Sequence, residues 1–196
     1  MKRSDRNNTK RLVGVSLFTA LVVILQLLGS FIRFGPFSIS LVAMPIVVGS
    51  AVYGVAAGAW LGLVFGVTVL LSGDAAAFMA ASVGGTIVTV LVKGILCGLA
   101  AGSVYALLAG KQSTVAAVVS AIVCPIVNTG TFLIGCFLFF IPILTEWATG
   151  MGFENVGRYM IFGLVGGNFL VELLTNVLLC PVILRLIQYG KKEQAQ

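Results

Sequence analysis

The sequence predicts an all-α integral membrane protein with about six transmembrane helices and both termini in the cytoplasm. Three observations lead to this fold class. Of the 196 residues, 59% are hydrophobic and 9% are charged, with a mean hydropathy of +1.12, whereas soluble domains carry roughly 25% charged residues. The apolar residues form runs of about 20, the length that a helix needs to cross a bilayer. The cations, finally, are distributed unevenly among the breaks between these runs.

Breaks rich in glycine, proline and polar residues divide the chain into the predicted helices. The second and third are so close in sequence that each is expected to tilt or to span incompletely. The longest break, residues 145–158, contains Trp147, Gly150 and Gly152 and is predicted to be a loop. No polar stretch is long enough for another folded module, so residues 1–196 form a single transmembrane domain. The predicted helices are residues 11–32, 39–55, 56–71, 83–108, 114–141 and 159–187.

Positive charge indicates the orientation. With an even number of crossings, the basic residues of both termini fall on one side, which is predicted to be cytoplasmic. The other side carries Arg33 and Arg158 but also the acidic residues Asp74, Glu146 and Glu154. Residues 1–10 are therefore a basic cytoplasmic N-terminus and residues 188–196 a polar cytoplasmic C-terminus of a multi-pass cell-membrane protein. The net charge of +6 needs no nucleic-acid partner. The cations of the predicted cytoplasmic side are Lys2, Arg3, Arg6, Lys10, Arg11, Lys111, Arg185, Lys191 and Lys192.

The first apolar run is expected to be a retained anchor. Residues 12–32 are longer than the apolar region of a signal peptide, which has about 7 to 15 residues, and no clear cleavage site follows. Glycines at four-residue spacing, Gly54, Gly58, Gly62 and Gly66, are interpreted as positions of close helix packing.

The composition and the motifs do not favour an enzyme or a metal-binding protein. The chain has no histidine, the commonest general base and a frequent metal ligand. Its cysteines show no C-x-x-C pairing and are interpreted as small apolar residues. Phosphate-loop, nucleophile-elbow and dinucleotide-binding motifs are missing. The sequence thus predicts neither an enzyme, nor a cofactor, nor a metal site. The four cysteines are Cys97, Cys124, Cys136 and Cys180.

Polar residues inside the last predicted helix indicate where a site lies. Asn168, Glu172 and Asn176 are spaced i, i+4, i+8 and therefore form one stripe on a helix. Lys93 is the comparable cation in an apolar run. An unpaired charge at the bilayer centre costs about 2.5 to 3.5 kcal/mol, so Lys93 and Glu172 are expected to face the interior, paired or lining a wet cavity. Within the stripe, Asn168 is expected to touch a ligand, Glu172 to pair with or orient Lys93, and Asn176 to lie beneath the pocket.

Two other predicted helices present polar faces at a similar depth. One carries Thr86, Thr89 and Lys93; the other carries Asn128 and Thr131, with Cys124 and Gly135 on the same side. Three polar faces at one level predict a binding pocket. The alternative is that Lys93 and Glu172 only bridge two helices while the amides act as interhelical contacts worth about 0.6 kcal/mol each.

Residues near the helix ends have simpler interpretations. Arg33, Arg158 and Trp147 are typical anchors at the membrane interface. Asp74, in Ser-Gly-Asp, is typical of a solvated turn.

Several short stretches together resemble the substrate-binding S component of energy-coupling factor (ECF) transporters. The resemblance spans nearly the whole chain and depends on the order of these stretches along the six-helix plan. They are the basic N-terminus running into Leu17-Phe18-Thr19-Ala20-Leu21, then Phe34-Gly35-Pro36-Phe37-Ser38-Ile39-Ser40-Leu41 with Pro45-Ile46, and Tyr53-Gly54-Val55-Ala56-Ala57-Gly58-Ala59-Trp60-Leu61-Gly62.

The resemblance implies a subunit that binds one water-soluble vitamin and topples in the membrane when a coupling transmembrane subunit and two ATPase subunits act. It implies a pocket in the extracellular half of the fourth to sixth helices. Two loops, residues 33–40 with Arg33 and Phe37 and residues 72–82 with Asp74, would act as lids. Within the family, the sequence looks closest to the pantothenate-type members, and Lys93 suits a vitamin with a carboxylate.

The resemblance also implies a docking surface for the coupling subunit on the first helix. In the family, small residues at four-residue spacing form this surface. Ser16 and Ala20 fit that pattern, but Ile24 departs from it. The alternative function that the residues allow is a self-contained secondary carrier or channel that uses Lys93 and Glu172.

Overall fold

The computed structural model describes the backbone of residues 3–31, 33–34, 37–38 and 41–195, and the side chains of residues 8–31 and 41–192. Nearly all of this part is helical, apart from the antiparallel pair β1 (Arg33–Phe34) and β2 (Phe37–Ser38). The helices are α1 (Arg3–Ser30), α2 (Ala43–Tyr53), α3 (Val55–Leu71), α4 (Ala76–Ala81), α5 (Val83–Leu108), α6 (Ser113–Phe139), α7 (Ile141–Gly150), α8 (Val156–Arg158), the π-helical η1 (Tyr159–Val165) and α9 (Gly166–Ala195).

The described part of the chain contains four stretches long and apolar enough to cross a membrane: Asn8–Ser30, Val83–Leu108, Ser113–Phe139 and Val156–Lys192. The predicted second and third helices are present as α2 and α3 but are shorter. At about 1.5 Å per residue neither reaches the roughly 30 Å of a hydrocarbon core. Gly54, with φ of +94°, separates them. The chain is therefore a multi-pass helical membrane protein, and six crossings remain a prediction.

Two predicted connections contain helices instead. Within residues 145–158, predicted as a loop, α7 continues to Gly150. Pro142 lies at the start of α7, where a fixed φ favours the first turn and the missing N–H is not needed. The helix ends at Gly150, and Gly152, two residues further on, has a positive φ of +77°. Similarly, α4 lies within residues 72–82.

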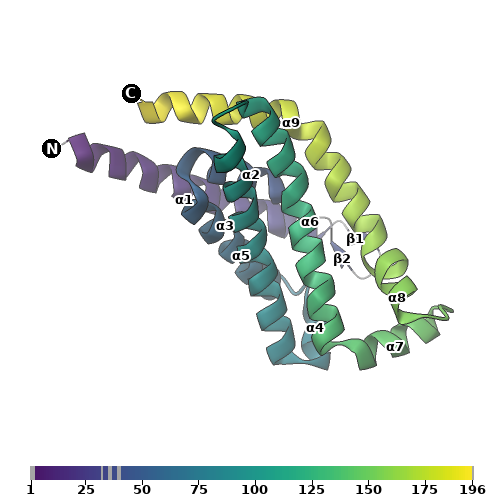
Figure 1. Ribbon diagram of the computed structural model, residues 1–196. Helices are drawn as coiled ribbons and strands as arrows, with labels where there is room; N and C mark the ends of the chain where they lie inside the picture. The colour runs from purple at the N-terminus through teal and green to yellow at the C-terminus, as the bar shows by residue number, and fades with distance from the viewer. Residues whose placement is uncertain (1–2, 32, 35–36, 39–40, 196) are drawn as a thin grey trace.

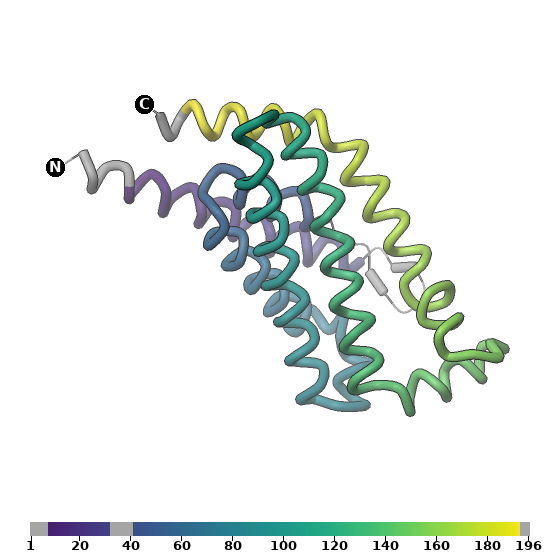
Figure 2. The backbone as a smooth tube through the Cα atoms, viewed as in Figure 1, coloured from purple at the N-terminus to yellow at the C-terminus, as the bar shows by residue number. Residues whose placement is uncertain are grey.

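The long helices are arranged around α5 (Figure 1). α5 packs most extensively against α3 on one side and α6 on the other, and α6 in turn packs against α9. α1 lies against α3 and α2. Both termini lie at one end of the molecule, whereas α4 and α7 lie at the opposite end (Figure 1). The tube in Figure 2 shows that α9 changes direction along its length; Pro181, which lies inside this helix, removes a backbone hydrogen bond.

Glycines bring α3 and α5 into backbone contact. A Cβ added at Gly62 would collide with the carbonyl of Gly94, and one added at Gly94 would collide with the carbonyl of Gly62. Gly58 and Gly98 form the same reciprocal contact one turn away. The interpretation of the spaced glycines as packing positions is thereby confirmed for Gly58 and Gly62. This contact fixes the position of the residue next to Gly94, which is Lys93.

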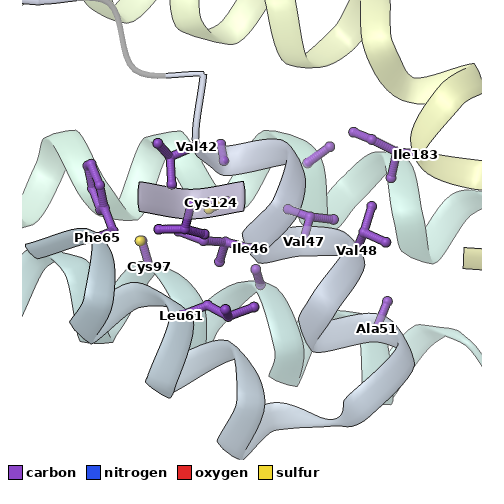
Figure 3. Packing of buried hydrophobic residues seen from close by; sticks show 14 of the residues in the cluster. Val42, Ile46, Val47, Val48, Ala51, Leu61, Phe65, Cys97, Cys124 and Ile183 are labelled. Carbon is purple, nitrogen blue, oxygen red and sulfur yellow. The ribbon is translucent and has the colours of Figure 1, made fainter. Parts of the chain in front are cut away.

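The short helix α2 lies in the centre of the apolar core (Figure 3). Its Ile46, Val47 and Val48 are fully buried and pack with Leu61 of α3 and Ile183 of α9. A helix that is covered on all sides has no need of a polar face. The sequence of α2 is apolar except for the buried Ser50, which donates to the carbonyl of Val47. This composition reflects burial by protein rather than exposure to lipid.

Candidate functional site

A cavity lies in the half of the molecule opposite the termini. It is bounded by the C-terminal part of α1, by α3, by α4 with the turn before it, by the first half of α5, by the second half of α6, and by η1 with the start of α9. The space free of atoms in and in front of this cavity, open solvent included, is about 850 Å³. The polar residues that line it are Gln26, Asp74, Thr86, Thr89, Lys93, Asn128, Thr129, Asn168 and Glu172.

Lys93 projects from α5 between two aromatic rings. Its Nζ atom lies 5.5 Å from the ring centroid of Phe65 on α3 and 5.2 Å from that of Phe132 on α6. Both distances are within the roughly 6 Å of a cation–π interaction. The rings therefore hold the ammonium group at the cavity wall while supplying no formal negative charge.

Glu172 lines the cavity from α9 and is only 8% exposed. The described residues contain no nitrogen–oxygen contact of 4.0 Å or less between Lys93 and Glu172. A direct ion pair, one of the two expected arrangements, is therefore absent. The reason is positional, because α6 packs between α5 and α9 and the two charges project from separate walls. In the structure both charges line one cavity, which was the other expected arrangement.

The predicted polar faces of α5 and α6 also meet at the cavity. Thr86 donates a hydrogen bond to the carbonyl of Ser82 at 2.7 Å. Thr89, 4% exposed, and Asn128 are buried, and Thr89 Oγ1 and Asn128 Oδ1 have no hydrogen-bond partner in the described part of the chain. On α9, Asn168 lines the cavity, whereas Asn176 is buried outside its lining. Buried acceptors normally have partners, so these atoms are suited to a bound molecule.

Thr131 does not line the cavity, although the sequence placed it with Asn128. Thr129 does so instead. At about 100° per residue, the lining residues Asn128, Thr129 and Phe132 span one arc of α6, and Thr131 lies roughly 60° beyond Asn128 on the far side of that arc. The i, i+3 spacing identified a helix face correctly but extended it to the wrong side.

Two lining residues escaped the sequence analysis or were misinterpreted. Gln26 of α1 is 2% exposed, and its Nε2 donates to Oδ2 of Asp74 at 2.7 Å. Asp74, interpreted from its own residues as a solvated turn residue and from the family resemblance as part of a lid, is half-buried and lines the cavity. Gln26 is the only side-chain amide in residues 11–32. An amide in an apolar membrane run is itself a signal of function.

The predicted lid segments differ in what the structure describes. Arg33 and Phe37 lie in β1 and β2, and their side chains are outside the described residues. The segment 72–82 holds α4, whose Phe78 lines the cavity and makes edge contacts with Phe132, Phe140 and Trp147. Trp147, expected as an interface anchor, is thus part of the aromatic cluster at this end.

Ser16 and Ala20 are exposed on α1, in line with Ile24, which is 53% exposed. They lie away from the cavity lining.

Charged and amide side chains that converge on a partly open cavity of a helical membrane protein are the arrangement typical of a small-molecule binding site. The family model of the substrate-specific component of ECF transporters matches residues 10–187. The chain belongs to this family. No individual curated protein matches it in sequence. Members bind a small-molecule substrate and work with an ECF transmembrane and ATPase module, so the family is one of transport components and not an enzyme class.

Proposed function

We propose that this protein is the high-affinity substrate-binding subunit of an ECF-type importer and that it captures a water-soluble vitamin with a carboxylate, pantothenate being favoured. Uptake is driven by a separate coupling transmembrane subunit and two ATPase subunits. The binding site is the cavity around Lys93, Asn128, Asn168 and Glu172.

The observation that carries the proposal is the state of Lys93. A cation in a membrane-embedded cavity needs a counter-charge, and the described residues give it two rings but no carboxylate within 4.0 Å. A ligand carboxylate at Lys93 completes this environment with a charge-assisted hydrogen bond. A purely structural lysine would be expected to have its counter-ion in the protein.

The orientation follows from the charges. The basic residues gather at the end of the molecule that holds the termini, and the cavity lies in the opposite half. Because basic residues favour the cytoplasmic side, the cavity opens outward and both termini are cytoplasmic. The exposed face of α1 at Ser16 and Ala20 is left for the coupling subunit, and the segments with Arg33, Phe37 and Asp74 close over the ligand.

A binding screen tests the proposal. Purified protein is titrated by calorimetry with water-soluble vitamins, including pantothenate, biotin, nicotinate, lipoate and thiamine. We expect at least one carboxylate-bearing vitamin to bind with submicromolar affinity. Silence across the whole panel, or binding of thiamine alone, would contradict it.

A further inference from the structure

Gln26 brings an amide from α1 into the cavity wall. α1 is otherwise the least buried of the long helices, with 17% of its span covered by protein. Gln26 is nevertheless 2% exposed and lines the cavity. The match to the family model assigns this residue no role.

The hydrogen bond to Asp74 fixes which end of the Gln26 amide is left without a partner. An ionised carboxylate only accepts hydrogen bonds, so the Gln26 atom 2.7 Å from Asp74 Oδ2 is the NH₂ nitrogen. The amide cannot be turned over without losing this bond. Oε1 is therefore the free end, and it has no hydrogen-bond partner among the described residues.

Further acceptors lie around the same cavity. Thr89 Oγ1 on α5 is buried and without a partner in the described part of the chain. The carboxylate of Glu172 on α9 adds acceptor oxygens. The cavity around Lys93 thus holds acceptor oxygens of Gln26 and Glu172 that a ligand donor can satisfy, and a Thr89 hydroxyl that can donate or accept. A ligand that supplied only a carboxylate would leave the Gln26 carbonyl buried and unsatisfied, which is unfavourable.

We propose that Gln26 is a ligand-contacting residue whose Oε1 accepts a hydrogen bond from a substrate hydroxyl or N–H group, and that it selects substrates carrying such donors in addition to one acid group. This inference rests on the proposed function and narrows its substrate class. Asp74 acts as a positioning residue, since it holds the Gln26 amide with the carbonyl free. Carboxylates without donors are discriminated against because a site built to hydrogen-bond a donor rejects analogues that lack it.

The test combines ligands and variants. Pantothenate and biotin carry a carboxylate with hydroxyl or N–H donors; nicotinate and lipoate carry a carboxylate without donors; panthenol keeps the donors of pantothenate but not its carboxylate. Each is titrated by calorimetry into the wild type, Gln26→Met and Thr19→Val. Thr19 is the matched control: it also links α1 to α3, accepting a hydrogen bond from Trp60 Nε1 at 3.1 Å, but lies outside the cavity lining.

We expect pantothenate or biotin to bind the wild type at least tenfold more tightly than nicotinate, lipoate and panthenol. Gln26→Met should reduce the affinity for pantothenate or biotin at least tenfold and should change the affinity for nicotinate and lipoate less than twofold. Thr19→Val should leave the affinities for all of these ligands unchanged. Should Gln26→Met fail to purify as a monodisperse protein, Gln26→Asn serves, because its side chain is too short to reach Asp74 and the ligand together.

The contradicting outcomes are separable. Unchanged affinity in Gln26→Met, or an equal loss for ligands with and without donors, would overturn the role of Gln26 and leave the proposed function standing. Silence of the wild type across all five ligands would overturn the proposed function and this inference with it.

Discussion

Lys93 shows how a charge is kept in a membrane protein without a direct ion pair to a protein carboxylate. Two rings at 5.5 and 5.2 Å stabilise its ammonium group, each by about 0.5 to 2 kcal/mol depending on desolvation. This stabilisation is smaller than that of a desolvated ion pair. A ligand carboxylate bound at Lys93 would therefore stabilise the ammonium group further.

The first prediction concerns this residue. Lys93→Met should weaken binding of a carboxylate-bearing vitamin by roughly 1.5 to 3 kcal/mol, about 10- to 150-fold, because it removes a charge-assisted contact in a secluded site. Calorimetry on the purified variant measures the loss. Lys111→Met, which removes an exposed lysine outside the cavity, is the control and should bind like the wild type. Equal affinity of both variants would make Lys93 a structural residue.

A second prediction compares two threonines. Thr89→Val replaces a buried hydroxyl that lacks a partner among the described residues by an apolar group of similar shape. It should raise the stability of the ligand-free protein by up to about 1 kcal/mol and yet lower the affinity for ligand. Thr131→Val, outside the cavity lining, should leave the affinity unchanged. Thermal unfolding with and without vitamin measures both effects; a parallel loss in the two variants would argue against a role for Thr89.

At the scale of elements, the glycine contact between α3 and α5 determines where the site residues lie. Gly94 meets the backbone of Gly62 directly, so α5 cannot move away from α3 without carrying Lys93 away from the ring of Phe65. In lipid, such close approach is a main source of helix association.

The third prediction is that Gly94→Ala destabilises the protein by about 1 to 3 kcal/mol, the usual cost of overpacking, and weakens ligand binding as well. Gly84→Ala is the matched control on α5, because a Cβ there meets nothing within 4 Å. It should be neutral or slightly stabilising, since alanine favours helices over glycine. Thermal unfolding in detergent compares the two; equal stability of both variants would show that the contact is looser than described.

Sequence periodicity predicted the elements better than their ends and contacts. Long apolar runs located α1, α5, α6 and α9, and i, i+3, i+4 spacing placed Thr86, Thr89 and Lys93 on one face, because these signals are local to a helix. The link between Gln26 and Asp74 joins residues 48 positions apart, which periodicity cannot relate. The absence of a Lys93–Glu172 ion pair likewise depends on how three helices pack.

For the whole molecule, the central question is on which side the cavity opens. The native cysteines are all buried, so a single introduced cysteine reports its own side. Glu154→Cys, at the end away from the termini, should react with a membrane-impermeant maleimide in intact cells. Lys111→Cys should react only after permeabilisation. The reverse pattern would invert the topology and contradict an outward-facing site.

The most direct test of the account is transport in liposomes. The chain is reconstituted alone and with its coupling subunit and two ATPases, and uptake of the vitamin identified by binding is followed with and without ATP. We expect sustained accumulation of the vitamin only with the complete complex and ATP, and no accumulation with Lys93→Met. Ala20→Trp should abolish accumulation but keep vitamin binding. Leu178→Trp, at another exposed position, is the control and should transport like the wild type. Gradient-driven accumulation by the chain alone would identify a self-contained carrier and contradict the account.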